Sequence, residues 1–165
     1  MLNPAGTAEM SFKIAYLADR PEAVPQIARW WFDEWGHLSP GSSIEDLSSR
    51  LRGLLSRERI PIQIVAIQDQ EVVGAAVLKL HEMVDLYPEK RFWLGNVYVA
   101  SGFRGRGIGS ALVMKIIEVA KSQGVDALHL QTESLNGGLY AKLGWEKIEQ
   151  VHYRGYDALV MVKRL

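Results

Sequence analysis

The sequence predicts an α/β protein of the α+β type, in which a mixed, mostly antiparallel sheet carries helices packed on it. Three observations support this fold class. Apolar residues alternate with polar ones in about seven short segments, as expected of strands. In about four longer segments they recur at the period of a helix. The order of these segments, β-αα-βββ-α-β-α-ββ, implies one mixed sheet with the helices on its faces.

The expected elements follow one another without a repeat, a linker or a low-complexity block. Strands are expected at residues 12–18, on both sides of an Asp69-Gln70 turn within residues 60–83, and at residues 92–100, 126–133, 145–153 and 157–165. Helices are expected at residues 21–35, 44–57, 110–124 and 135–144, the second of them capped by Ser43. All 165 residues are expected to form a single domain, with residues 1–9 as a disordered N-terminal extension.

Composition narrows the possible partners. Lys and Arg together number 19, as do Asp and Glu, so the formal net charge is zero, and no run of basic residues suggests a nucleic acid partner. The absence of cysteine excludes disulfides, thiolate metal sites and a cysteine nucleophile, and no metal site is expected. The N-terminus lacks the pattern of a signal peptide, and no apolar run approaches the ~20 residues that cross a bilayer. We therefore expect no membrane partner and a cytoplasmic location.

A glycine-rich junction between a strand and a helix is the first candidate binding site. It comprises Arg104, Gly105, Arg106, Gly107, Ile108, Gly109 and Ser110. The first N–H groups of a helix lack internal partners and lie at the positive end of its dipole, so such a junction attracts anions. Glycines let the backbone curl around a phosphate, and the two arginines add donors and charge. The alternative is a simple turn; the combination with two arginines favours a phosphorylated ligand.

The junction fits neither of two common nucleotide motifs. A P-loop requires lysine before Ser110, and a dinucleotide fingerprint requires a different glycine spacing. The pattern Arg104-x-x-Gly107-x-Gly109 instead resembles the signature of the GNAT superfamily of N-acetyltransferases. Two further segments resemble that family, namely Val97-Tyr98-Val99 before the signature and Leu139-Tyr140-Ala141-Lys142-Leu143-Gly144-Trp145 after it. The resemblance in element order covers nearly the whole chain.

The resemblance implies a GNAT fold whose sheet is splayed between its fourth and fifth strands. It also implies acetyl-CoA as cosubstrate, with the pyrophosphate on the backbone of the residues from Arg104 to Ser110. The pantetheine arm would pair with the exposed edge of the strand containing Val97 and Val99. Tyr140 matches the family's tyrosine that acts as general acid toward the CoA thiolate, a task that a phenol can perform. A packed aromatic side chain is the structural alternative for this residue.

A general base is less evident. Residues 93–96, where some family members carry a carboxylate or histidine, read Trp-Leu-Gly-Asn and contain no group that titrates near neutrality. The substitutes that we consider are His81 and Glu82, then Asp85, Glu34 and Glu133. Strand alternation would point His81 and Glu82 to opposite faces, so one of them would face the acceptor. Ordered water, or an acceptor amine of low pKa, would make a protein base unnecessary.

Two classes of function follow from these observations. The first is an N-acetyltransferase in which a primary amine of a small molecule or a peptide attacks acetyl-CoA directly in a ternary complex. The second is a non-catalytic module that binds acyl-CoA. The acceptor pocket is expected between the first two helices, residues 83–91 and the C-terminal strands, with Trp30 or Phe32 as candidate lining residues. The chain is expected to be a monomer or a homodimer.

Overall fold

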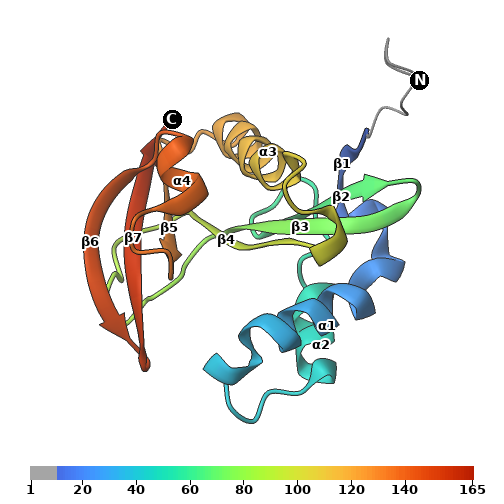
Figure 1. The fold of residues 1–165 in the computed structure, drawn as a ribbon, viewed down its shortest axis with the longest axis horizontal. Helices are drawn as coiled ribbons and strands as arrows, with labels where there is room; N and C mark the ends of the chain where they lie inside the picture. The colour runs from blue at the N-terminus through green and yellow to red at the C-terminus, as the bar shows by residue number, and fades with distance from the viewer. Residues whose placement is uncertain (1–10) are drawn as a thin grey trace.

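The computed structural model describes residues 11–165, whose strands form a seven-stranded sheet in the order β1-β2-β3-β4-β5-β7-β6 (Figure 1). The strands are β1 (Lys13–Tyr16), β2 (Ile62–Gln68), β3 (Glu71–Lys79), β4 (Trp93–Val99), β5 (Ala127–Thr132), β6 (Glu146–Tyr153) and β7 (Tyr156–Arg164). The α-helices are α1 (Val24–Trp35), α2 (Ile44–Arg52), α3 (Ile108–Ser122) and α4 (Gly138–Lys142). Every strand pair is antiparallel except β4–β5, so the expected mixed sheet is confirmed. The expected extension, residues 1–9, lies outside the described residues.

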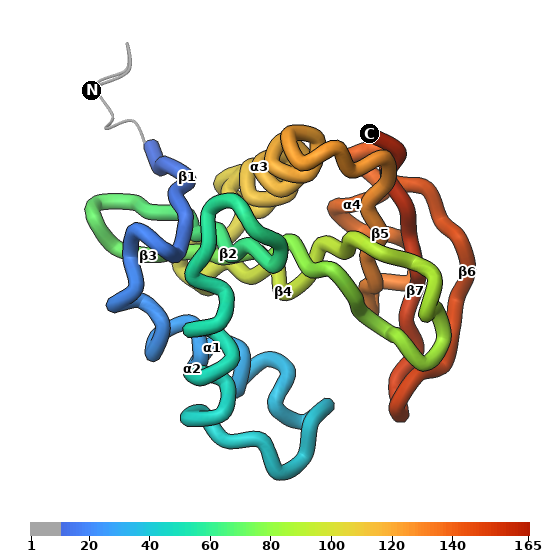
Figure 2. Tube along the Cα trace, turned by 180° about the vertical axis from the view of Figure 1, so that it is seen from behind, coloured from blue at the N-terminus to red at the C-terminus, as the bar shows by residue number. Residues whose placement is uncertain are grey.

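The sheet has two halves that diverge between β4 and β5 (Figures 1 and 2). Helix α3 covers one face of β1–β4, with Leu112 and Ile116 buried against Ile64. Helices α1 and α2 cover the opposite face, with Ile27 packed in a cluster that includes Val65. Helix α4 lies on the β5–β7–β6 half (Figure 1). In residues 11–165, no helix is both long and apolar enough to pass through a membrane.

The first two helices follow from local sequence signals. In α1, Val24, Ile27, Ala28 and Trp31 are buried at helical spacing, so Trp31 belongs to the core. Ser43 caps α2 as expected, because its Oγ accepts from the Asp46 N–H while the Asp46 carboxylate accepts from the Ser43 N–H, both at 3.0 Å. Helix α2 ends at Arg52 rather than at residue 57, because Gly53 follows as its C-cap.

The β2–β3 hairpin turns at the expected place. Asp69 and Gln70 adopt φ of +50° and +67°, as a tight two-residue hairpin turn requires. Strand β3 ends at Lys79, however, and not near Met83 as expected. The chain leaves the sheet there and turns with Met83 at φ +52°. His81 and Glu82 therefore lie in a loop, so the argument from strand alternation does not apply to them.

The predicted splay is confirmed between β4 and β5. These parallel strands pair at one register position, Trp93↔His129, where the His129 N–H donates to the Phe92 carbonyl at 3.0 Å. A β-bulge in β4 accompanies the divergence. Its pairing with β3 shifts between Val77↔Gly95 and Ala75↔Tyr98, so β4 carries one more residue there than β3. Such an extra residue bends the strand and increases its twist, which turns β4 away from β5.

Candidate active site

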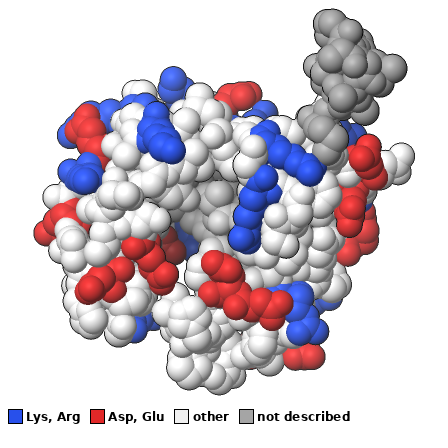
Figure 3. Space-filling model, viewed as in Figure 1, with Lys and Arg blue, Asp and Glu red and all other residues white. Residues whose placement is uncertain are grey.

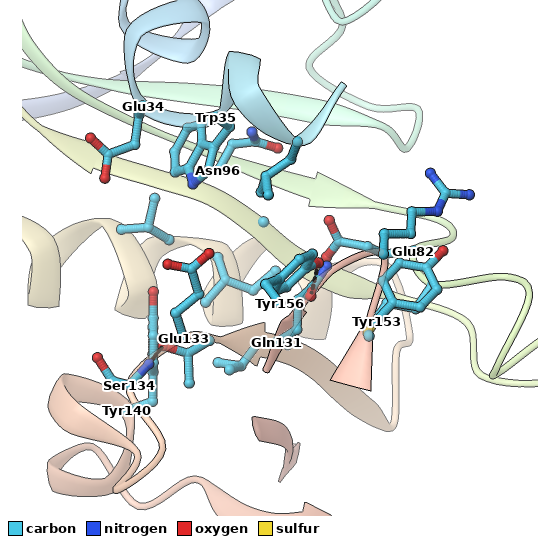
Figure 4. A pocket seen from close by; sticks show the side chains of 18 of the residues that line it. Glu34, Trp35, Glu82, Asn96, Gln131, Glu133, Ser134, Tyr140, Tyr153 and Tyr156 are labelled. Carbon is cyan, nitrogen blue, oxygen red and sulfur yellow. Dashed lines mark hydrogen bonds between the residues drawn. The ribbon is translucent and has the colours of Figure 1, made fainter. Parts of the chain in front are cut away.

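A pocket of about 500 Å³ lies at the splay, between the two halves of the sheet (Figures 3 and 4). Its walls come from α1 and the turn that follows, the loop after β3, the diverging strands β4 and β5, helix α4 and the β6–β7 turn. Side chains from distant parts of the sequence therefore meet here. They include Glu34, Trp35, Glu82, Asn96, Val97, Gln131, Glu133, Tyr140, Tyr153, Arg154 and Tyr156.

Acidic side chains surround this pocket. Glu34, Glu82 and Glu133 line it from three different elements, and Figure 3 shows acidic residues on both sides of the hollow. Glu82 forms an ion pair with Lys79, whose Nζ lies 3.0 Å from the carboxylate. Both side chains are partly buried, with exposures of 25% for Lys79 and 19% for Glu82. No group of three or more His, Cys, Asp or Glu within residues 11–165 is placed to hold a metal ion.

Tyr140 lines the pocket from α4 (Figure 4). The helix starts after Gly137, which adopts φ +89°, and the Asn136 side chain accepts from the Gly138 N–H at 3.0 Å. Asn136 therefore stabilises the turn before α4. Burial, and next the negative charge of Glu82, raises the pKa of Tyr140 to about 12. The phenol thus keeps its proton at neutral pH and can donate it.

The two candidate bases face different pockets. Glu82 lines the pocket that contains Tyr140. His81 is exposed and lines a neighbouring pocket instead. The two side chains thus line different pockets from a loop, and the expected strand alternation does not apply to them.

The β6–β7 turn forms a further wall of the pocket, as expected of the C-terminal strands, although the sequence did not single out Tyr153 or Tyr156 as lining residues. Tyr153 and Arg154 both donate to the Asp85 carboxylate, at 3.3 and 3.1 Å. Tyr156 donates to the side-chain oxygen of Gln131 at 2.6 Å (Figure 4). These bonds tie the turn to the loop after β3 and to β5. The cluster of aromatic residues around Arg154 was the available signal in the sequence.

The glycine-rich junction has the geometry of an anion site. Gly105 and Gly107 adopt φ of +77° and +83°, and a Cβ added at either position would meet no atom within 4 Å. These glycines are therefore needed for their backbone conformation, and the space beside them is open. Helix α3 begins at Ile108, earlier than the expected residue 110, and its first N–H groups point out of the helix without a side-chain cap. Ile108, Gly109 and Ser110 thus present these groups from the first helical turn.

The two arginines of the junction are exposed and lie beside aromatic rings. Arg104 donates from Nε to the Val99 carbonyl at 2.8 Å, and its guanidinium lies 5.5 Å from the centre of the Tyr98 ring. Arg106 lies 5.3 Å from the centre of the Phe103 ring. The contact with Val99 links the junction to the end of β4.

The aromatic residue of α1 that lines the pocket at the splay is not one of those expected. Trp30 stacks on Tyr98 with ring centres 4.9 Å apart, and Phe32 is 37% exposed. Neither of these two lines the pocket at the splay; Trp35 does. The expectation for Trp30 and Phe32 was therefore wrong, because the end of α1 rather than its middle faces the opening between the strands.

Comparison with known proteins assigns the family. The model of the acetyltransferase (GNAT) family matches residues 24–145. The chain belongs to this family. Among curated GNAT relatives, N-acetyltransferase 8B of Homo sapiens is 35% identical over 99 residues, which is 58% of this chain and 43% of that protein. An uncharacterized N-acetyltransferase of Methanocaldococcus jannaschii is 43% identical over 73 residues, which is 42% of this chain and 30% of that protein. The chain thus spans less than half the length of these relatives.

Solved GNAT structures match most of the chain. A ribosomal-protein-alanine N-acetyltransferase from Brucella melitensis has a TM-score of 0.70 and 27% identity, covering 94% of this chain and 100% of that one. An aminoglycoside 6'-N-acetyltransferase complexed with coenzyme A has a TM-score of 0.72 at 16% identity, covering 92% of this chain and 96% of that one. The second likeness concerns the fold alone. Both confirm the predicted GNAT fold.

Replacing Tyr140 with Phe should change how stability depends on alkaline pH. Folding raises the pKa of Tyr140 from 10.0 to about 12, so the folded state binds the phenolic proton more tightly than the unfolded chain. This stabilisation is complete below pH 10 and is lost as the pH rises through about 12. The unfolding free energy of the wild type, measured by urea denaturation, should therefore fall relative to that of Tyr140→Phe as the pH rises above 10. A difference that stays constant would contradict the raised pKa.

Proposed function

We propose that this protein is an N-acetyltransferase that moves the acetyl group of acetyl-CoA to a primary amine. The amine attacks the thioester directly, in a ternary complex. One observation carries this proposal: Val97 of the splayed strand β4 and Tyr140 of α4 line the same pocket. A donor lying along β4 would bring its thioester within reach of a protonated phenol. The same pocket has acidic walls, which suit the acceptor.

The residues of the junction fit the pyrophosphate of CoA. Open space beside Gly105 and Gly107, and the free N–H groups of Ile108, Gly109 and Ser110, offer donors to phosphate oxygens. Arg104 and Arg106 add positive charge at the rim. Val97 and Val99 lie on the part of β4 that diverges from β5, where backbone groups are available to the pantetheine arm.

Acetyl-CoA supplies the reaction with a thioester carbonyl and a thiolate leaving group. Tyr140 donates its proton to the departing sulfur, since its raised pKa keeps it protonated at neutral pH. Glu82 accepts a proton from the attacking amine, directly or through water, and we prefer it to His81 because it shares the pocket of Tyr140. The other two carboxylates, Glu34 and Glu133, attract the cationic amine toward this position.

Both small-molecule and peptide amines fit these requirements. The names of the two structural relatives cover both classes, an aminoglycoside and a ribosomal protein. An acidic pocket about 500 Å³ in volume admits the amine-bearing end of either.

Purified protein should release CoA thiol from acetyl-CoA when amines are supplied, and Tyr140→Phe should lower kcat by roughly 100-fold, because the phenol no longer donates a proton. Pools of polyamines, amino acids, aminoglycosides and short peptides, read out by thiol release, identify the acceptor class. The affinity for acetyl-CoA should stay nearly unchanged in this variant. Tyr16→Phe is the matched control, since Tyr16 lies on β1 outside the pocket. Binding of acetyl-CoA without release from any pool would favour the non-catalytic module.

Replacing Gly107 with Val should weaken acetyl-CoA binding by roughly tenfold or more. A valine side chain strains a backbone at φ +83° and fills the space that the pyrophosphate would occupy. Calorimetry of acetyl-CoA binding measures the effect. Gly124→Val is the control, because Gly124 has φ +79° and equally open surroundings at the other end of α3. Equal affinity in the two variants would remove the phosphate role from the junction.

Replacing Glu82 with Gln should lower kcat by roughly 100-fold, because the amide that replaces the carboxylate cannot accept the amine proton. Steady-state kinetics with the identified acceptor measure this effect. Glu133→Gln removes a charge from the same pocket and controls for weaker attraction of the cation. Equal losses of kcat in the two variants would show that Glu82 is not the base.

A further inference from the structure

A second pocket of about 430 Å³ adjoins the first, between helices α1 and α2 and the ends of β3 and β4. Its walls are largely apolar. Trp31 and Leu47 are each 7% exposed and Val77 is fully buried, and Leu54 and Pro61 complete this surface. The pocket therefore offers a preformed apolar site that the proposed transfer reaction does not use.

The two pockets meet at shared residues. Trp35, Ser39 and Asn96 line both of them. The Lys79–Glu82 ion pair also joins them, because Lys79 lines the second pocket and Glu82 lines the first. A molecule whose amine lies near Glu82 can therefore continue past Asn96 into the second pocket.

The charged side chains of the two pockets differ. The second pocket is lined by Arg50, Lys79 and His81 and by no Asp or Glu, whereas three glutamates line the first together with Arg154, which is paired with Asp85. Lys79 is already paired with Glu82. Within residues 11–165, Arg50 forms no ion pair closer than 4 Å, although it is exposed and its charge acts on the Asp46 carboxylate of the same helix. Its guanidinium therefore has no close carboxylate partner at the rim of the pocket.

We propose that the second pocket is a subsite for the far end of the acceptor, and that it selects an amine whose apolar skeleton ends in a carboxylate. This inference rests on the proposed function, since it assumes that the amine lies in the first pocket. The ammonium group is drawn to the acidic side, the apolar skeleton passes Trp35 and packs against Trp31, and the carboxylate pairs with Arg50. A short amine does not extend into the subsite and gains nothing from it. A diamine brings a second positive charge there, which the basic side chains at its rim repel.

Three linear amines of equal length test the subsite: aminooctanoate, octylamine and diaminooctane. They share the amine and differ in the group at the far end. Calorimetry on the full chain, with CoA present, should show aminooctanoate binding roughly tenfold more tightly than octylamine, and diaminooctane most weakly. Arg50→Glu should reverse the order of aminooctanoate and diaminooctane. Arg52→Glu, which makes the same change on α2 but lines neither pocket, should preserve the wild-type order.

The possible results separate this inference from the proposed function. Octylamine binding as tightly as aminooctanoate, a preference for diaminooctane, or an order unaffected by Arg50→Glu would each overturn the subsite. Thiol release from acetyl-CoA with the same amines is measured in parallel on the wild-type protein. The expected binding order without thiol release would support the subsite and contradict the transferase. Thiol release without the expected order would support the transferase and overturn the subsite.

Discussion

The bulge in β4 is the constraint on which the candidate site depends. Its partner β3 is buried between two clusters, one under α3 and one under α1 and α2, so β3 cannot shift to absorb the extra residue. The bend therefore falls on β4, where Asn96 adopts φ +49°. Beyond Trp93, β4 runs free of β5, and the pocket opens in the angle between them. Val97 therefore does not pair with β5 and lines the pocket instead.

Packed aromatic side chains at both ends of β4 maintain the angle between β4 and β5. Where the strands still touch, Trp93 is fully buried, with its ring centre 5.3 Å from His129 and 6.1 Å from Tyr87. Where β4 has diverged from β5, the ring of Tyr98 stacks on the ring of Trp30 from α1, with ring centres 4.9 Å apart. Aromatic pairs of this kind add stability beyond the area that they bury. The opening is thus built into the core and does not depend on a ligand to separate the strands.

The predictable parts of this protein are those encoded in adjacent residues. The Ser43 cap, the Asp69-Gln70 turn and the glycine-rich junction each depend on a short motif with one favoured backbone geometry. The end of β3 at Lys79 was missed because the apolar pattern continues past it, and the turn at Met83 has no glycine or proline to mark it. The pocket was expected between the first helices, residues 83–91 and the C-terminal strands, and residues from most of these elements line it. The pairings of its polar side chains, such as Tyr156 with Gln131, could not be predicted, since they join elements far apart in sequence.

The absence of a side chain at Gly95, within residues 93–96, has a physical explanation. A Cβ at Gly95 would lie 2.7 Å from the Cε of Lys79, so the side chain of Lys79 occupies the space above this glycine. From there Lys79 reaches Glu82 at 3.0 Å and holds its carboxylate at the pocket. A larger residue at position 95 would displace Lys79 and release Glu82. The bulged strand thus leaves room for the side chain of Lys79, and the loop after β3 brings the Glu82 carboxylate to the pocket.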